Sequence, residues 1–298
     1  MIFPTSGVEI HPLVPFLVAL FVSFFTSMGG VSGAFLLLPF QVSFLGYTSP
    51  SVSATNQVFN IIAIPSGIYQ YIREGRMLWP LSKYIIIGTL PGVFIGAWVR
   101  VEYLPNPRNF KLFAGCILVF IGYRLFVDIV NKNKPTASEP SIMTANSSLV
   151  VVMESSFKKV CFEYNENIYT FKPLLVLILC FLVGIIGGIY GIGGGSIIAP
   201  FLVTFFALPV YTIAGAALSG TFVTSIAGVL FYHFLAKFYP TLEVSPDWIL
   251  GCLFGIGGLI GMYFGAKTQH LIPAKVIKGI LCFSALFIAG KYIMDFIQ

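Results

Sequence analysis

Long apolar runs constrain this chain more than any other feature of its sequence. Eight of them follow one another, at residues roughly 13–46, 50–71, 81–100, 109–130, 174–207, 210–236, 247–267 and 275–296. Six have about the length of one bilayer crossing, which takes about 20 apolar residues in a helix. A membrane β-barrel would instead show segments of about ten residues that alternate between apolar and polar side chains. The runs therefore predict an all-α polytopic membrane protein.

The composition excludes other classes of protein. Hydrophobic residues make up 57% of the 298 residues and charged residues only 9%, whereas a soluble domain carries about 25% charged residues. A disordered chain would need low hydrophobicity, so it is excluded too. The net charge of +6 comes from basic residues that flank the apolar runs, which favours lipid head groups over nucleic acid as their partner. We expect a multi-pass protein of the plasma membrane.

The first and fifth runs differ from the others because each exceeds 30 residues and contains a glycine-rich break. The breaks lie at Met28–Gly33 and Gly191–Gly195, and glycine in that density is a poor helix former. The flanking pieces of about 13–16 residues would be about 20–24 Å long as helices, which is short of a hydrocarbon core of about 30 Å. Two explanations stay open: a re-entrant hairpin, or one long, broken and tilted helix.

The two halves of the chain repeat each other. A shift of 161 residues superposes the first break on the second, and a shift of 169 superposes a later glycine series. The superposed pairs are Gly30 and Gly191, Gly33 and Gly194, Pro39 and Pro200, Gly67 and Gly228, Tyr71 and Tyr232, Gly88 and Gly257, Gly92 and Gly261, Gly96 and Gly265, and Ala97 and Ala266. Residues 1–130 and 173–298 are thus predicted to be two pseudo-symmetric repeats, each with a glycine-broken or re-entrant helix plus three full spans. This pattern is typical of secondary transporters.

Residues 131–172 join the halves as a polar linker, in which residues 149–153 fit a short strand or helix. The relative orientation of the halves depends on the breaks, because a hairpin inverts the second half and a single span leaves the halves parallel. With the linker and the 72–83 loop in the cytoplasm, inversion places 12 of the 17 basic residues there and the parallel arrangement places 11. The positive-inside rule therefore favours inversion by one residue, and the shortness of the half-helices favours it further.

The sequence argues against several kinds of chemistry. The central portions of the eight runs contain no Asp, Glu, Lys or Arg, which disfavours a proton relay of buried carboxylates. The three histidines and five cysteines are not spaced as metal ligands, and no nucleophile with a base can be assigned. We expect neither an enzyme nor a metal site, and no cofactor.

Backbone groups at the two breaks remain as the candidate site. A helix that begins inside the membrane leaves its first N–H groups unpaired, and its positive end attracts anions. Polar residues of the 50–71 run and of its repeat mate could complete such a site, although hydrogen bonding between helices is the alternative role for them. Helix packing is the alternative role for the glycines. It is favoured for the later glycines that are spaced four residues apart, which are Gly92, Gly96, Gly257, Gly261 and Gly265. The candidate substrate-binding residues are Ser32, Gly33, Ala34, Asn56, Gln57, Asn60, Gly193, Gly194, Gly195, Ser196, Ser219 and Thr221.

The glycine motifs resemble those of a known family. The stretch Gly191–Leu202 is similar to the repeated glycine-rich motif of the sulfite exporter TauE/SafE family, and Gly30–Pro39 is similar to its degenerate partner. The resemblance covers nearly the whole chain apart from the linker. It implies a transporter of sulfur-containing anions such as sulfite, sulfoacetate or related sulfonates, often for export. The first copy has Ser32 and Ala34 where the second has Gly193 and Gly195, so the two half-sites need not be equivalent.

The sequence thus favours a secondary transporter or facilitator that moves a small sulfur-containing anion by alternating access. An anion channel, or a permease for a different small anion, is the alternative hypothesis. The oligomeric state stays open, with a homodimer as one option.

Overall fold

A computed structural model describes residues 1–28, 31–130, 149–268 and 274–297. Its first five helices are α1 (Leu13–Met28), α2 (Ala34–Ser43), α3 (Ser51–Arg73), α4 (Trp79–Glu102) and α5 (Pro107–Val130). The last five are α6 (Pro173–Tyr190), α7 (Gly194–Phe206), α8 (Val210–Leu235), α9 (Trp248–Thr268) and α10 (Ala274–Ile297). Six of these helices, α4, α5, α6, α8, α9 and α10, are long and apolar enough to cross a membrane. The described part of the chain is therefore a multi-pass helical bundle.

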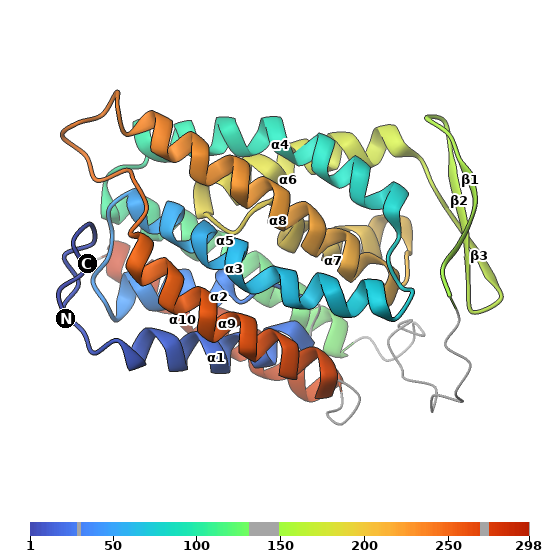
Figure 1. The fold of residues 1–298 in the computed structure, drawn as a ribbon, viewed down its shortest axis with the longest axis horizontal. Coiled ribbons are helices and arrows are strands. Elements are labelled where there is room, and N and C mark those ends of the chain that lie inside the picture. The colour runs from blue at the N-terminus through green and yellow to red at the C-terminus, as the bar shows by residue number, and fades with distance from the viewer. Residues whose placement is uncertain (29–30, 131–148, 269–273, 298) are drawn as a thin grey trace.

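The prediction of an all-α chain is wrong for the segment between the two sets of helices. Strands β1 (Val151–Ser155), β2 (Val160–Tyr164) and β3 (Asn167–Phe171) form an antiparallel sheet in the order β1-β2-β3. Valine and aromatic residues supply its strand propensity. Asn165 and Glu166 connect β2 to β3 with φ angles of 50° and 59°, as a two-residue type I′ turn requires. The sheet lies beyond the helix ends (Figure 1), while the first part of the expected linker, 131–148, lies outside the described residues.

Helix contacts recur between the two halves of the bundle. Helix α1 packs along α9, and α6 packs along α4. Helix α3 packs against α9, and α8 packs against α4 in the same way. Two further contacts, α3 with α8 and α5 with α10, join helices that hold the same place in each set of five. Every one of these contacts is therefore either exchanged with another or retained when the two sets of helices are interchanged.

Glycines let the paired helices touch backbone to backbone. A Cβ atom at Gly261 of α9 would lie 2.9 Å from the carbonyl carbon of Leu20 in α1. One at Gly92 of α4 would lie 2.8 Å from the amide nitrogen of Ile185 in α6. The same closeness recurs one turn away in both directions, at Gly88, Gly96, Gly257 and Gly265. Small residues allow this approach in membranes, so the packing interpretation of the four-residue glycine series is confirmed.

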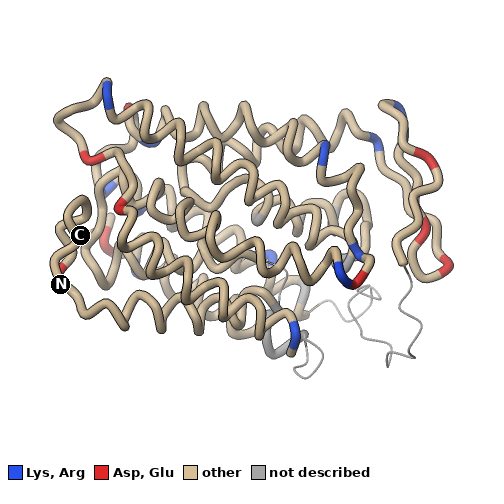
Figure 2. Tube along the Cα trace, viewed as in Figure 1, with Lys and Arg blue, Asp and Glu red and all other residues tan. Residues whose placement is uncertain are grey.

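Charged residues gather at the two ends of the bundle, and the middle of the described helices carries hardly any (Figure 2). Both termini lie at one end and the sheet lies at the other (Figure 1). At the sheet end, the basic residues in or next to the ends of α3, α4, β1–β3, α6 and α9 include Arg73, Arg76, Lys83, Lys158, Lys159, Lys172 and Lys267. This separation of charge from an apolar middle is the distribution that a bilayer requires.

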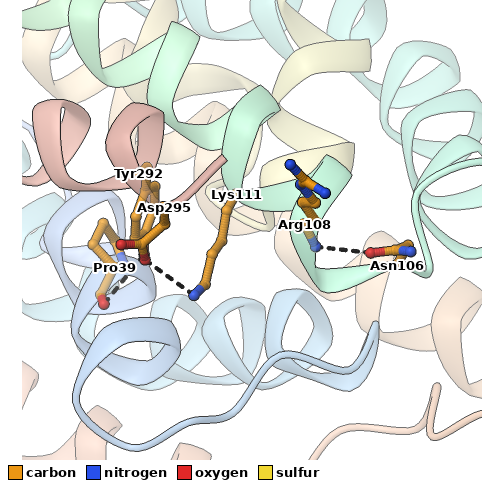
Figure 3. A network of polar contacts seen from close by, with 6 residues as sticks. All are labelled: Pro39, Asn106, Arg108, Lys111, Tyr292 and Asp295. Atoms are coloured by element: carbon orange, nitrogen blue, oxygen red, sulfur yellow. Dashed lines mark hydrogen bonds and ion pairs between the residues drawn. The ribbon is translucent and has the colours of Figure 1, made fainter. Parts of the chain in front are cut away.

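Near its C-terminal end, α10 is joined to α2 and α5 (Figure 3). The hydroxyl of Tyr292 donates to the carbonyl oxygen of Pro39 over 3.3 Å. Lys111 and Asp295 form an ion pair with an N–O distance of 3.3 Å, and their side chains stay 26% and 35% exposed. An ion pair this accessible stabilises a fold by less than about 1 kcal/mol, so packing holds α10 in place.

At the end of the bundle that holds both termini, Asp247 directly precedes α9. Its carboxylate is fully buried and accepts hydrogen bonds from the backbone amide and hydroxyl of Ser6, at 3.0 and 2.8 Å. The same carboxylate accepts from the Leu250 amide over 3.0 Å, which caps the helix. Nearby, burial raises the pKa of the Tyr47 phenol well above its ordinary value, so this group stays protonated at neutral pH.

Candidate functional site

Both long apolar runs are interrupted where the glycine clusters predict it. Helix α6 ends at Tyr190 and α7 begins at Gly194, while α1 ends at Met28 and α2 begins at Ala34. In the second break, Gly191 and Gly193 adopt φ angles of 77° and 76°, positive values that glycine adopts without steric cost. In the first break, Gly29 and Gly30 lie outside the described residues.

Two asparagines of α3 bridge the breaks. The amide nitrogen of Asn56 donates to the carbonyl oxygens of Ala34 over 2.9 Å and of Gly191 over 3.1 Å. The amide nitrogen of Asn60 donates to the Ile192 carbonyl oxygen over 2.8 Å, and its amide oxygen accepts from the Ser32 hydroxyl over 2.5 Å. Each asparagine therefore touches both breaks, and the start of α2 and the 191–193 bend meet at one face of α3.

Helix α8 closes the other side of the second break. Asn60 also donates to the hydroxyl of Ser225, over 3.3 Å. A Cβ atom at Gly193 would lie 2.9 Å from the Thr221 side chain and 3.1 Å from the Ser225 hydroxyl. A Cβ atom at Gly195 would lie 2.7 Å from the Thr221 amide nitrogen. The start of α7 is thus pressed against α8, through two polar residues one helical turn apart.

Packing demands glycine at the helix starts as well. A Cβ atom at Gly194 would lie 2.5 Å from the Thr89 side chain of α4, and one at Gly33 would lie 2.9 Å from the Ser23 hydroxyl of α1. Neighbouring helices therefore occupy the space that side chains at these positions would need. The glycines let both helix starts sit deep within the bundle, among buried hydroxyl groups.

The remaining candidates occupy other surroundings. The hydroxyl of Ser219 donates to the carbonyl oxygen of Ala216 in its own helix over 2.8 Å. This hydrogen bond stays within α8 and does not link Ser219 to the breaks. Gln57 is fully buried against Gly228 of α8, and neither its amide nitrogen nor its amide oxygen has a hydrogen-bond partner among the residues that the structure describes. Ser196 lies in the first turn of α7, and its side chain lies outside the described residues.

Three polar residues outside the candidate substrate-binding set also join this region, and one of them, Ser225, belongs to the polar residues of the repeat mate that were expected to complete the site. Gln41 of α2 is fully buried and donates to the Asn56 amide oxygen over 3.3 Å. Thr89 and Ser225 border the second break. Gln41 could have been found as a lone polar side chain in an apolar segment, and Ser225 by its place one turn after Thr221. Thr89 gives a weaker signal, because a threonine hydroxyl can donate to a carbonyl oxygen of its own helix, as Thr89 does to Ile85 over 2.6 Å.

Arg100 is a buried cation, although basic residues that flank the apolar runs are expected to lie at the lipid head groups. Its side chain is fully buried in the last turn of α4. It donates to the carbonyl oxygens of Thr48, over 3.1 Å, and of Leu104, and it stacks 3.7 Å above the Phe110 ring. These partners come from two loops and α5, so the guanidinium group fastens the bundle at the end that holds both termini.

The chemistry of the junction is neutral and rich in hydrogen-bonding groups. Amides and hydroxyls line it, and the hydrogen-bond partners of Asn56 and Asn60 within the described part of the chain include no carboxylate. No group of three or more His, Cys, Asp or Glu among the described residues could hold a metal ion. Two helix starts that carry partial positive charge converge here, an arrangement that suits a small anion better than a cation.

Comparison with known proteins supports a transport role. The family model for the sulfite exporter TauE/SafE matches residues 15–292. The "Probable membrane transporter protein YunE" of Bacillus subtilis is 21% identical over 277 residues, which cover 90% of this chain and 92% of that protein. The "Probable membrane transporter protein YdhB" of the same bacterium is 31% identical over 119 residues, 39% of this chain and 45% of that protein.

A plant protein matches a shorter stretch. The "Sulfite exporter TauE/SafE family protein 6" of Arabidopsis thaliana is 38% identical over 110 residues, which are 37% of this chain and 24% of that protein. No solved structure gives a significant match. Because the family model covers almost the whole helical bundle, the resemblance expected from the glycine motifs is confirmed. The chain belongs to the sulfite exporter TauE/SafE family, whose relatives are named as membrane transporters.

Proposed function

We propose that this protein is a secondary transporter or facilitator that moves a small sulfur-containing anion across the plasma membrane. The cargo is sulfite, sulfoacetate or a related organosulfonate, and the direction is export. The anion binds where the two glycine breaks meet, and one half of the bundle moves against the other to give alternating access. Membership in the sulfite exporter family supports the class of cargo.

The convergence of both breaks on α3 is the observation that carries this proposal. Because Asn60 touches Ser32 and Ile192, the first turns of α2 and α7 share one neighbourhood. The first N–H groups of a helix have no partner within it. Two such starts in a dry bundle attract negative charge without a charged side chain. The substrate-binding set we propose is Ser32, Gly33, Ala34, Asn56, Gln57, Asn60, Gly193, Gly194, Gly195, Ser196, Ser219 and Thr221.

We further propose that α1 and α2 form a re-entrant hairpin. Ser6, which precedes α1, donates to Asp247 over 3.0 Å, and the amide of Ser51 at the start of α3 donates to Glu243 over 2.9 Å. Both ends of the α1–α2 segment therefore contact residues 243–247, one through the Asp247 carboxylate and the other through the backbone carbonyl oxygen of Glu243. Because this segment begins and ends at the same end of the bundle, the contacts favour a hairpin over a single crossing of the membrane.

The second half is proposed to be an inverted copy of the first. The exchange pattern of helix contacts supports the pseudo-symmetry. Helix α6 follows the sheet directly. Gly215, in the first turns of α8, faces Met77 of the segment between α3 and α4. The same segment accepts a hydrogen bond from the amide of Val150, just before the sheet. Helices α6 and α7 thus enter and leave at the sheet end, opposite to α1 and α2. The basic residues there make this end the cytoplasmic one by the positive-inside rule.

Transport by purified protein in liposomes tests the proposal. Liposomes that contain the protein should take up radiolabelled sulfite or sulfoacetate with saturable kinetics, and unlabelled anion inside should accelerate uptake by counterflow. Flux that does not saturate and shows no counterflow would instead assign an anion channel. Saturable uptake of acetate in place of the sulfur anions would assign a permease for a different anion. No flux above protein-free liposomes for any of these anions would refute the proposal.

A further inference from the structure

The two repeats fill one packing position in two chemically different ways. Gln57 of α3 and Leu218 of α8 correspond under the 161-residue shift, as do Gly67 and Gly228. A Cβ atom at Gly228 would lie 2.7 Å from both Cδ and Nε2 of Gln57. One at Gly67 would lie 3.2 Å from Cδ1 of Leu218. Each side chain therefore covers a glycine of the facing helix, one with an amide and the other with an aliphatic group.

The amide is the costlier of the two solutions. Gln57 is 0% exposed, and in the described part of the chain neither of its amide atoms has a hydrogen-bond partner. Burial of an unpaired amide destabilises a fold, and leucine at the same position would bear no such cost. Leu218 is itself buried, at 3% exposure, in the equivalent contact. Packing between α3 and α8 therefore accounts for a leucine at this position, such as Leu218, but does not account for the glutamine at position 57.

Position connects this amide to the breaks. Gln57 lies one turn before Asn60 on α3, and Gly228 lies one turn after Ser225 on α8, while Asn60 and Ser225 are bonded to each other. The nitrogen atoms of Asn56 and Asn60 are each engaged by two acceptors of the protein. Gln57 is thus the carboxamide beside the junction whose N–H groups are not used within the described structure.

We propose that Gln57 is the residue that selects the cargo, because its free N–H group donates to an oxygen atom of the transported anion. Binding in this way requires the Gln57 amide to turn from Gly228 toward the junction about its three side-chain torsions, with α3 in place. A donor at this point favours an oxyanion, whose several oxygen atoms can accept from Gln57 and from the two helix starts together. The inference rests on the proposed function, whose central site it refines. It also makes the site asymmetric, since only one repeat supplies the amide.

Replacement by the residue of the other repeat is the decisive experiment. We expect Gln57→Leu to melt at the same or a higher temperature than the wild type in detergent. Its dissociation constant for sulfite should rise about 10- to 100-fold, as for the loss of one hydrogen bond to a charged group. Gln57→Met, which keeps an unbranched side chain of similar length, should behave likewise. Leu218→Gln is the matched control, and it should melt at a lower temperature with sulfite affinity retained.

The outcomes separate this inference from the function beneath it. Wild-type protein that binds sulfite, together with a Gln57→Leu variant of equal affinity, would overturn the role of Gln57 and leave the proposed function standing. A wild type without saturable sulfite or sulfoacetate binding would remove the proposed function itself. Lower melting temperatures for both Gln57→Leu and Gln57→Met would show that the amide serves the fold, and would overturn the inference as well.

Discussion

Asn60 is the residue that the account makes most important for the architecture of the breaks. It accepts from Ser32 over 2.5 Å and donates to Ile192 and Ser225 over 2.8 and 3.3 Å. Substitution by alanine removes these three hydrogen bonds and leaves three buried polar groups to find new partners. Hydrogen bonds between membrane helices contribute about 0.6 kcal/mol each on average, and those in protein interiors about 1 kcal/mol. With about 1 kcal/mol for the cavity, Asn60→Ala should lose about 3–4 kcal/mol of unfolding free energy.

Reversible unfolding in mixed micelles, followed by the fluorescence of the three tryptophans, measures this loss. Ser66→Ala is the matched control on the same helix, because the Ser66 hydroxyl bonds Ala63 and Leu259 at the edge of the bundle, over 2.9 and 3.1 Å. The control should change stability by less than about 1 kcal/mol. A loss below about 0.5 kcal/mol for Asn60→Ala, which is the scatter of surface substitutions, would refute the reasoning that α3 ties the breaks together.

Further predictions concern packing and capping. Gly261→Ala should destabilise the protein by about 1–3 kcal/mol, because the added methyl group overlaps the Leu20 carbonyl. Gly290 has open space around it, so Gly290→Ala should stabilise the protein by up to about 1 kcal/mol through helix propensity. Equal melting temperatures for the two variants would contradict the close α1–α9 contact. Asp247→Ala should cost about 2–3 kcal/mol by removing a buried charged cap. Asp295→Asn should cost less than about 1 kcal/mol, since the ion pair of Asp295 is accessible to solvent. A larger loss for Asp295→Asn than for Asp247→Ala in thermal unfolding would contradict the difference in burial between the two carboxylates.

Much of the fold follows from the sequence, because the bilayer leaves few choices for an apolar chain. Run length predicted the spanning helices, and glycine density predicted both interruptions, since glycine both disfavours helix and permits the positive φ angles at Gly191 and Gly193. The sheet was missed as a sheet. Its strands are short, and residues 149–153 by themselves fit a strand or a helix equally well. Pairing with β2 decides between them, and pairing is not visible in a local pattern.

The candidate site was predicted by residue type more successfully than by geometry. Polar residues on α3 indicated the right helix, but their positions in the sequence did not show which of them face the breaks. In the structure, Asn56 and Asn60 face the breaks together and Gln57 turns to α8. The burial of Arg100 was also missed. Its carbonyl partners come from loops about 50 residues away and four residues away, so no helical periodicity could reveal it.

The most direct measurement is a high-resolution density map of the protein saturated with sulfite or sulfoacetate. The account predicts density for the anion between the first turns of α2 and α7, within hydrogen-bonding distance of the Gln57 amide nitrogen. Anion density at a site remote from both turns, or a cation held by carboxylates at their junction, would contradict it.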